Sequence, residues 1–350
     1  MTPALYFGFL FLALAVSMVL IVPFIGLLYK LNFKRARQKT IDPFGRPTPI
    51  FDKFHAGKAG TPVGGGILVI LVVSVLMILA MALINALQLP MTYNYTNKNA
   101  EIFVLLFTFL SFGALGLYDD VKKFFGFEKT GFFGMHMPQK LAIQVILSLI
   151  IACTMYWALG IDFINIPLIG EIQLGWLYVP FAAFVIVSFT NAVNITDGLD
   201  GLAGGVMLIS LFGFWLICTM SSTVGLDGPL SLFITLFIGT LIAFVYFNVY
   251  PARIFLGDVG ALSFGAILAV MGLLVGKPAA LVVMGGIFVV EIFTSLVQLL
   301  SKKFLHRKFF PVAPLHLFFQ KIGWQEPKIV QRFWLLQIVL TLFGIWLTLF

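Results

Sequence analysis

Most of the aspartates that could do chemistry stand in three short clusters, each beside a long apolar run. The clusters lie at 119–120, 191–202 and 258. The chain has only 14 Asp and Glu in 350 residues, so carboxylates grouped in this way indicate a shared task. Carboxylate oxygens are preferred ligands of hard divalent cations such as Mg²⁺. We therefore expect the three clusters to converge and to hold a divalent cation against phosphate groups.

Asp119 and Asp120 close the third apolar run, where we expect the helix to end. Adjacent helical residues point in different directions. One carboxylate is therefore expected to bind a cation, while the other orients a lysine or acts as a base. The alternative is a solvated helix end, which the helix dipole disfavours for an acid. Lys122 and Lys123 follow and would screen the charge.

Asn191, Asn194, Asp197 and Asp200 recur every three residues. In a helix this spacing keeps neighbours near one face. Alternatively, Asp197-Gly198 breaks the helix and turns the chain. Amides and carboxylates together suit recognition of a base, a ribose or a hydrated magnesium ion. A polar loop between two helices is the non-functional interpretation.

Phe255 and Asp258 lie just before the eighth apolar run. Asp258 is expected to be the N-cap of that helix, which is an ordinary structural role. Its position beside the other acidic clusters favours a further role in metal binding. Phe255 has two equal interpretations, stacking on a nucleotide base or apolar anchoring at the membrane interface.

Lys58 lies in a segment, 53–66, where basic residues are followed by glycines at a predicted helix start. Such a start can bind phosphate. The segment lacks the GxxxxGK[ST] pattern of a P-loop. A flexible basic linker is the alternative.

His316 stands in the last loop among aromatics, prolines and cations, a mixture that suits an amphipathic segment at the interface. Glu291 lies inside the ninth apolar run. A carboxylate there costs about 2.5–3.5 kcal/mol to insert, so we expect it to face the bundle interior or a wet groove. A protonated, packed Glu291 is the alternative.

The elements that carry these residues are expected to be membrane helices. Apolar residues make up 61% of the chain and charged residues 10%, against about 25% charged in soluble domains. Continuous apolar runs of spanning length predict an all-α, polytopic membrane protein with one domain over 1–350. The runs are 4–29, 63–89, 102–118, 141–160, 174–190, 202–220, 230–250, 260–276, 279–300 and 333–350. We expect a small hairpin in 161–175.

Basic residues predict the orientation of the bundle. Alternate connecting segments hold 20 of the 22 Lys and Arg, and only Lys98 and Lys277 lie on the other side. The basic side is therefore expected to be cytoplasmic, with the active-site groove on it and both termini outside. The net charge of +8 then fits a membrane surface and a phosphate-rich substrate rather than nucleic acid.

Together these strings resemble the phospho-N-acetylmuramoyl-pentapeptide transferase (MraY) family, within the polyprenyl-phosphate sugar-1-phosphate transferases. The resemblance covers nearly the whole chain. It rests on Gly60-Thr61-Pro62 with Gly64-Gly65, Asp119-Asp120, Asn191 to Leu202, Phe255-Leu256-Gly257-Asp258, and Ala313-Pro314-Leu315-His316 through Gly323-Trp324, in that order.

The resemblance implies transfer of phospho-MurNAc-pentapeptide from UDP-MurNAc-pentapeptide to undecaprenyl phosphate, giving lipid I and UMP with Mg²⁺ as cofactor. It implies a multi-pass protein of the bacterial inner membrane and leaves a homodimer open. It puts Asp258 on the metal and in catalysis with Asp119 and Asp120. Residues implied to bind substrate are Lys58, Asn191, Asn194, Asp197, Asp200, Phe255 and His316.

One difference keeps a second transferase open. The family has three histidines in a row where this chain has His316, Leu317 and Phe318. A transferase of UDP-HexNAc to polyprenyl phosphate is therefore the alternative. A secondary transporter would place its acids near the bilayer midplane, where we expect only Glu291, and a structural scaffold would need no aspartate cluster.

Overall fold

The computed structural model describes residues 2–35, 56–89, 91, 95–125, 134–220 and 228–348. In this part of the chain, nine helices are long and apolar enough to cross a membrane, and a bent pair makes up to ten. The prediction of a polytopic, all-α membrane protein is confirmed. The nine helices are α1 (Pro3–Lys30), α3 (Gly65–Ala86), α4 (Lys98–Phe125), α5 (Met137–Leu159), α6 (Tyr178–Thr196), α7 (Leu202–Met220), α8 (Pro229–Asn248), α9 (Gly257–Leu274) and α13 (Glu326–Thr348).

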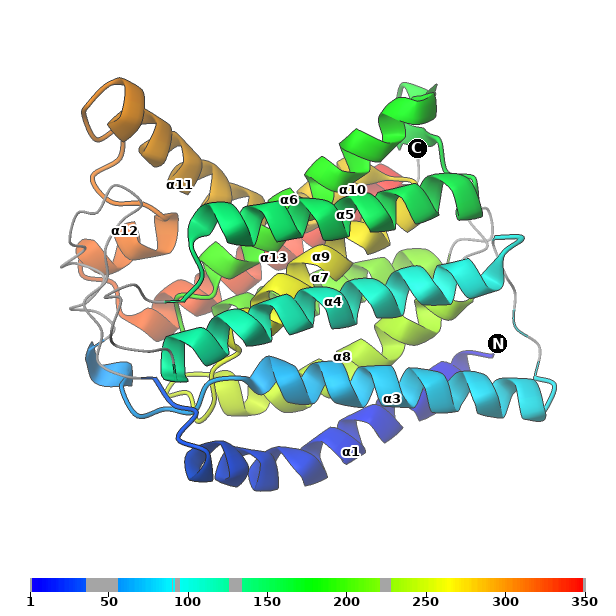
Figure 1. Cartoon of the computed structure of the whole chain (residues 1–350), viewed down its shortest axis with the longest axis horizontal. Coiled ribbons are helices and arrows are strands. Elements are labelled where there is room, and N and C mark those ends of the chain that lie inside the picture. The colour runs from blue at the N-terminus through cyan, green and yellow to red at the C-terminus, as the bar shows by residue number, and fades with distance from the viewer. Residues whose placement is uncertain are drawn as a thin grey trace.

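Helices α8 and α9 form the centre of the bundle, and the others surround them (Figure 1). In each of these two helices 89% of the apolar span is buried, against 28% in α1 and α5. Small residues let the backbones come close, as is usual in membrane bundles. A methyl group on Gly66 of α3 would lie 2.3 Å from the Gly260 nitrogen, and one on Gly116 of α4 would lie 2.2 Å from the Asp258 carbonyl oxygen. Both α3 and α4 therefore pack tightly on the start of α9.

The ninth apolar run does not form one straight helix, so the prediction over 279–300 is corrected. It divides into α10 (Pro278–Met284) and α11 (Gly286–Phe304), which meet at 82°. A glycine pair, Gly285-Gly286, lies at the break, and such pairs are a common cause of sharp bends. Gln337 of α13 satisfies backbone groups there: its Nε2 donates to the Met284 carbonyl, and its Oε1 accepts from the Ile287 nitrogen at 3.3 Å.

The predicted hairpin is confirmed. Strands β1 (Phe163–Ile166) and β2 (Gly170–Gln173) pair antiparallel, with Phe163 opposite Gln173. Both chain ends lie at this end of the bundle, whereas α12 (Leu315–Lys321) and the far end of α11 lie at the other (Figure 1). Among the described residues, the acidic cluster lies at the α12 end, and so do Lys58, Lys123 and Lys140, which pair with acids there.

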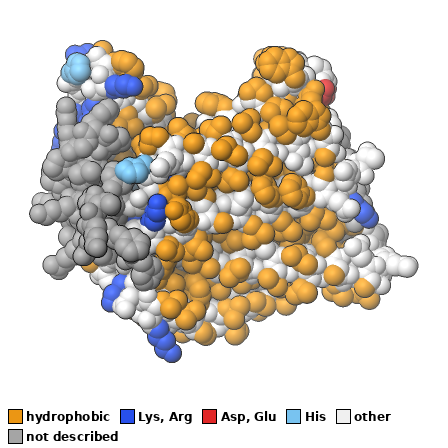
Figure 2. Space-filling model, viewed as in Figure 1, with side chains coloured by type: hydrophobic (Ala, Val, Ile, Leu, Met, Phe, Trp, Pro, Cys, Tyr) orange, Lys and Arg blue, Asp and Glu red, His pale blue; other side chains and the backbone are white. Residues whose placement is uncertain are grey.

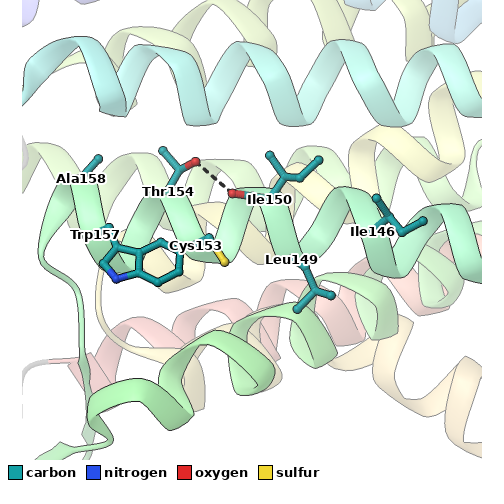
Figure 3. Close-up of a pocket in the computed structure, with 7 residues that line it drawn as sticks. All are labelled: Ile146, Leu149, Ile150, Cys153, Thr154, Trp157 and Ala158. Carbon is teal, nitrogen blue, oxygen red and sulfur yellow. Dashed lines mark hydrogen bonds between the residues drawn. The ribbon is translucent and has the colours of Figure 1, made fainter.

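Hydrophobic side chains cover the face between the two ends, and most Lys and Arg side chains visible there lie at the α12 end (Figure 2). A shallow, mostly apolar groove also runs along the outer side of α5 (Figure 3). Its one hydroxyl, on Thr154, donates to the Ile150 carbonyl at 2.9 Å, so the groove suits hydrocarbon. The groove is lined by Ile146, Leu149, Ile150, Cys153, Thr154, Trp157 and Ala158.

Candidate active site

Asp119, Asp120 and Asp258 converge at the α12 end of the bundle, as the sequence predicts. The two local predictions are corrected. Asp119 and Asp120 do not end their helix, because α4 continues to Phe125. Asp258 is not an N-cap: it lies in the first turn of α9, and the cap position is Leu256. The three carboxylates are therefore held on two regular helices that pack closely against each other.

Lys123 lies at the centre of this acidic cluster. Its Nζ is 3.1 Å from Asp119 Oδ2, 2.8 Å from Asp258 Oδ2 and 4.0 Å from Asp120 Oδ1. A single ammonium group thus touches or approaches all three carboxylates. Lys140, near the start of α5, lies 2.9 Å from Asp119 Oδ2 and also pairs with Asp258 Oδ2. The sequence predicted that one of the two adjacent aspartates orients a lysine, but it did not identify Lys123, which was assigned only to charge screening, or Lys140.

The two adjacent aspartates have different backbone partners, as their directions on a helix require. Asp119 Oδ1 accepts from the Met135 nitrogen at 2.7 Å, and Asp120 Oδ2 accepts from the Val259 nitrogen at 3.1 Å. Two glycines make room for these carboxylates. Gly134 and Gly257 have φ of +84° and +78°, and a methyl group on either would lie 2.7 Å from a carboxylate oxygen. Side chains other than glycine would be strained there.

A second charged group lies beside the first and is centred on Lys58. This lysine ends a short 3₁₀ helix, η1 (Ala56–Lys58); residues 53–55 of the predicted phosphate segment lie outside the described residues. Lys58 Nζ is 2.6 Å from Asp200 Oδ1 and 2.5 Å from Glu326 Oε1. Asp200 Oδ2 accepts from the Ala252 nitrogen at 3.0 Å. Sequence reasoning placed Lys58 and Asp200 in one site but missed Glu326.

The polar repeat from Asn191 to Asp200 is only partly helical. Helix α6 ends at Thr196, Asp197 is its C-cap, and α7 starts at Leu202, so the alternative of a break at Asp197-Gly198 is correct. Asn191 donates to Gln144 Oε1 of α5 at 2.7 Å, so its amide ties two helices together. Asn194 is half-buried in the last turn of α6.

Phe255 is half-buried beside two cations, of which the sequence predicted only Lys58 for the nucleotide side. Arg35 Cζ lies 5.7 Å and Lys58 Nζ 6.0 Å from the centre of its ring. The backbone of Phe255 is fixed by bonds to the segment before α3: its nitrogen donates to the Pro62 carbonyl at 2.8 Å, and its carbonyl accepts from Gly65 at 2.8 Å. The ring is thus held at a set position beside Lys58, as a stacking platform would need.

His316 is buried, with 1% of its surface exposed, and pairs with the Glu291 carboxylate. Its Nδ1 is 3.0 Å from Glu291 Oε2, and its backbone nitrogen donates to Glu291 Oε1 at 3.1 Å. The expectation that Glu291 faces the bundle interior is confirmed. A methyl group on Gly198 would lie 2.5 Å from His316 Nε2. The imidazole therefore lies between Glu291 and the 197–201 link, and Leu317 beside it is buried.

We expect the stability difference between the wild type and Asp197→Asn to depend on pH. Burial, and then the charge of Asp258, raises the pKa of Asp197 from 3.8 to about 7, although Arg35 and Lys58 oppose the shift. Between these two values the folded protein binds more protons than the unfolded chain, so this group makes stability fall as pH rises. Asp197→Asn should therefore gain melting temperature relative to the wild type as pH rises from about 4 to about 7.

Thermal melts of both proteins in detergent, without donor or Mg²⁺, would measure this difference. A difference that stays constant across the range would show that Asp197 has an ordinary pKa.

The acidic cluster can be tested for its fit to a divalent cation. Within the described residues, no three His, Cys, Asp or Glu side chains form a group that could hold a metal ion alone. Mg²⁺ usually needs less: one or two carboxylates, together with substrate phosphates and water. The point now held by Lys123 Nζ, within 4.0 Å of three carboxylates, is suited to such a shared cation. The residues therefore fit Mg²⁺ bound jointly with substrate.

Comparison with known proteins matches the part of the chain that carries the acidic clusters. The model of glycosyl transferase family 4 matches residues 102–276, a range that contains all three acidic clusters. Among curated relatives, the phospho-N-acetylmuramoyl-pentapeptide-transferase of Desulfotalea psychrophila is 34% identical over 349 residues, covering 95% of this chain and 90% of that protein. The enzyme of the same name from Acetivibrio thermocellus is 35% identical over 295 residues, 83% of each chain. That from Rickettsia bellii is 34% identical over 324 residues, 88% of this chain and 85% of the relative.

Fold and site thus define a multi-pass, all-α membrane protein with a carboxylate and lysine cluster at one end of the bundle. The chain belongs to glycosyl transferase family 4 and, within it, to the phospho-N-acetylmuramoyl-pentapeptide-transferase family. Lys58, Glu291, His316 and Glu326 lie outside the region matched by the family model. The structure brings all four to the 197–201 link or to a residue that touches it.

Proposed function

We propose that this protein transfers phospho-MurNAc-pentapeptide from UDP-MurNAc-pentapeptide to undecaprenyl phosphate, producing lipid I and UMP. One observation carries the proposal: a cluster of three carboxylates and two lysines lies beside a separate Lys58 and Phe255 site, at one end of an apolar bundle. A membrane lipid phosphate and a soluble nucleotide can meet at such an end. The names of the relatives indicate the same reaction.

The two charged groups suit the two substrates. Lys123 and Lys140 offer ammonium groups to the phosphate of the lipid, and their hold on Asp119 and Asp258 keeps them in place. On the other side, Phe255 offers a ring to the uracil, and Lys58 offers a cation to the donor. Charge-assisted hydrogen bonds to phosphate are among the stronger polar contacts. Asp197 and Asp200, in the link that follows α6, are proposed to contact the nucleoside through its polar groups. Asn191 ties α6 to α5 through Gln144, and Asn194 is proposed to face the same substrate.

In the proposed reaction, an oxygen of the lipid phosphate attacks the phosphorus attached to the sugar. The bond from that phosphorus to the bridging oxygen breaks, and UMP leaves with the electron pair. A phosphate monoester is ionised near neutral pH, so direct attack needs little help from a base. Asp119 or Asp120 orients the lipid phosphate or accepts its last proton. A covalent aspartyl-phosphate route is the alternative.

Asp258, with help from Asp119 or Asp120, is proposed to hold Mg²⁺ together with the donor's phosphates. When bound, this ion would neutralise charge on the pyrophosphate and on the departing UMP. Lys123 and Lys140 would then be released from Asp258 toward the phosphate oxygens.

The site end is proposed to face the cytoplasm of a bacterium, in the inner membrane, with both termini outside. The basic residues near the spans support this orientation. Cysteine labelling should confirm it in a background where Cys153 and Cys218 are replaced by serine. A membrane-impermeant maleimide should label Ile169→Cys, on the exposed hairpin tip, in intact cells. It should label Lys321→Cys, which is exposed at the site end, only after permeabilisation.

The two labelling positions control for each other, because each must react when it is accessible. Labelling of Lys321→Cys but not Ile169→Cys in intact cells would reverse the proposed orientation.

A UDP-HexNAc transferase to polyprenyl phosphate is the second candidate, and the loop at His316 favours it. Leu317 is buried, with 5% of its surface exposed. An apolar side chain therefore packs into the protein at the position where the family has a second histidine. The donor is tested by measuring UMP release from a panel of UDP-sugars with undecaprenyl phosphate and Mg²⁺. We expect UDP-MurNAc-pentapeptide to be used best. Faster UMP release from UDP-GlcNAc would show that the protein is the UDP-HexNAc transferase instead.

A transporter is less well supported. Glu101, which lies in α4, is buried, but its Oε1 accepts from the Leu230 nitrogen at 3.1 Å. It therefore caps the start of α8, where an acid is favourable. Glu291 is engaged by His316. Both buried glutamates thus have structural partners, so neither indicates a path for ions.

A further inference from the structure

Glu326 is the first residue of α13, and one of its oxygens joins two parts of the nucleotide side of the site. Its Oε1 accepts from Lys58 Nζ at 2.5 Å and from the Asp200 backbone nitrogen at 2.5 Å. The side chain is 10% exposed. A carboxylate with this little water is costly unless it is paired and hydrogen-bonded, and here both conditions are met by residues of the site.

Through these two bonds, Glu326 fixes three separate segments relative to one another. Lys58 belongs to η1, and Asp200 to the link between α6 and α7. Asp200 in turn accepts from Ala252 at 3.0 Å, three residues before Phe255. The cation and the acidic link proposed to bind the nucleotide are therefore both bonded to one carboxylate, and the link is bonded in turn to the segment that leads to Phe255.

A second contact shows that α13 supports this link over more than one turn. Trp334 Nε1 donates to the Gly201 carbonyl at 3.2 Å, and a methyl group on Gly205 would lie 2.1 Å from the Trp334 ring. Glu326 bonds to Lys58 and to the link, whereas Asp119 and Asp258 pair with Lys123 and Lys140. Its influence should therefore fall on the donor and not on the lipid phosphate.

We propose that Glu326 is a positioning residue of the donor site, which sets Lys58 and the 197–201 link for the UDP group. This inference rests on the proposed function. Glu326 acts through Lys58 and the backbone of Asp200 and does not itself touch the donor. Glu326 lies outside residues 102–276, so the match to the family model does not include it.

The sign of the effect separates positioning from simple charge. Glu326 brings a negative charge near an anionic donor, so if it acted only through its charge, its removal would strengthen donor binding. Positioning predicts the reverse. In Glu326→Gln, the hold on Lys58 weakens and the Asp200 nitrogen keeps only a neutral acceptor. We expect the Kd and KM for UDP-MurNAc-pentapeptide to rise about 10-fold, with kcat and the KM for undecaprenyl phosphate changed less than about twofold.

Two further variants make the test specific. Glu326→Asp keeps the charge but is shorter, so it cannot keep both bonds, and it should weaken donor binding like Glu326→Gln. In a Lys58→Met background, Glu326→Gln should have a smaller further effect than in the wild type, because only its bond to the Asp200 nitrogen remains to be weakened and residues that act through each other give non-additive changes. Glu171→Gln is the matched control: it makes the same exchange at an exposed position on the hairpin and should change nothing.

Calorimetric titration of the full-length protein with UDP-MurNAc-pentapeptide measures donor binding, and thermal melts check that each variant is folded. Tighter or unchanged binding by folded Glu326→Gln, or full additivity with Lys58→Met, would overturn the inference. Such a result would leave the proposed function intact. If the wild type itself binds no UDP-sugar, both the proposed function and the inference fail.

Discussion

Replacing Asp258 by asparagine is expected to lower UMP release on the order of 10²–10³-fold, the usual loss when one preorganised electrostatic group leaves an active site. The Asp258 carboxylate pairs with both Lys123 and Lys140 and is the proposed ligand of Mg²⁺. Asparagine keeps the shape of the side chain but removes the negative charge that pairs with the two lysines and would bind Mg²⁺. The loss should be largest at limiting Mg²⁺ and should be partly relieved as Mg²⁺ is raised.

The protein should remain folded in this variant, because Asp119 still holds both lysines. A melting temperature near that of the wild type would separate loss of chemistry from loss of structure. Asp162→Asn makes the same exchange at the hairpin end of the molecule and should retain full activity. UMP release near the wild-type rate at limiting Mg²⁺ would refute the assignment of Asp258 to the metal.

Replacing His316 by alanine is expected to impair both stability and turnover. His316 and Glu291 are both buried, 1% and 0% exposed, and bond to each other at 3.0 Å. Leaving a buried polar group without its partner typically costs about 1–3 kcal/mol. The lost imidazole would also leave space beside Gly198, so the link that carries Asp197 and Asp200 would lose its support. We expect turnover to fall at least about 10-fold even where the variant is folded.

Two variants separate the imidazole's support of the link from its pairing with Glu291. Gly198→Ala leaves the pair unchanged but puts a methyl group 2.5 Å from His316 Nε2, so it should also lower turnover. Glu291→Gln keeps hydrogen-bonding atoms beside His316 and should be milder than His316→Ala. The account of this loop is wrong if His316→Ala melts and turns over like the wild type.

The helices could be predicted because lipid demands long apolar segments whose backbone is internally bonded. The break between α10 and α11 was not predicted, because the residues around it are as apolar as those of a straight helix. Only Gly285-Gly286 signalled it, and glycine pairs also occur in straight packed helices. Gln337, which bonds to both sides of the break, comes from α13 and cannot be assigned to the break from sequence spacing.

The aspartates of the site could be predicted because carboxylates are rare in such a chain and are therefore noticeable. Lysines are common on the basic side, so nothing in the sequence separates Lys123 and Lys140 from the other cations there. Glu326 resembles an ordinary acid in the first turn of a helix, where the dipole favours it. Its bonds to Lys58 and Asp200 span 268 and 126 residues, and only the folded bundle reveals them. His316 was noticed, but its burial against Glu291 was not.

In the proposed reaction, a sugar-linked phosphate moves from a nucleotide to a lipid at the α12 end of this bundle. This transfer is tested most directly with UDP-MurNAc-pentapeptide carrying ³²P in the phosphate attached to the sugar. The purified protein, undecaprenyl phosphate and Mg²⁺ are incubated with this donor, and the butanol-soluble lipid is counted. We predict that the label enters the lipid in step with UMP release and that Asp258→Asn lowers both together, by about 10²–10³-fold at limiting Mg²⁺. Label that stays on the nucleotide, or appears as a water-soluble sugar phosphate, would contradict the account.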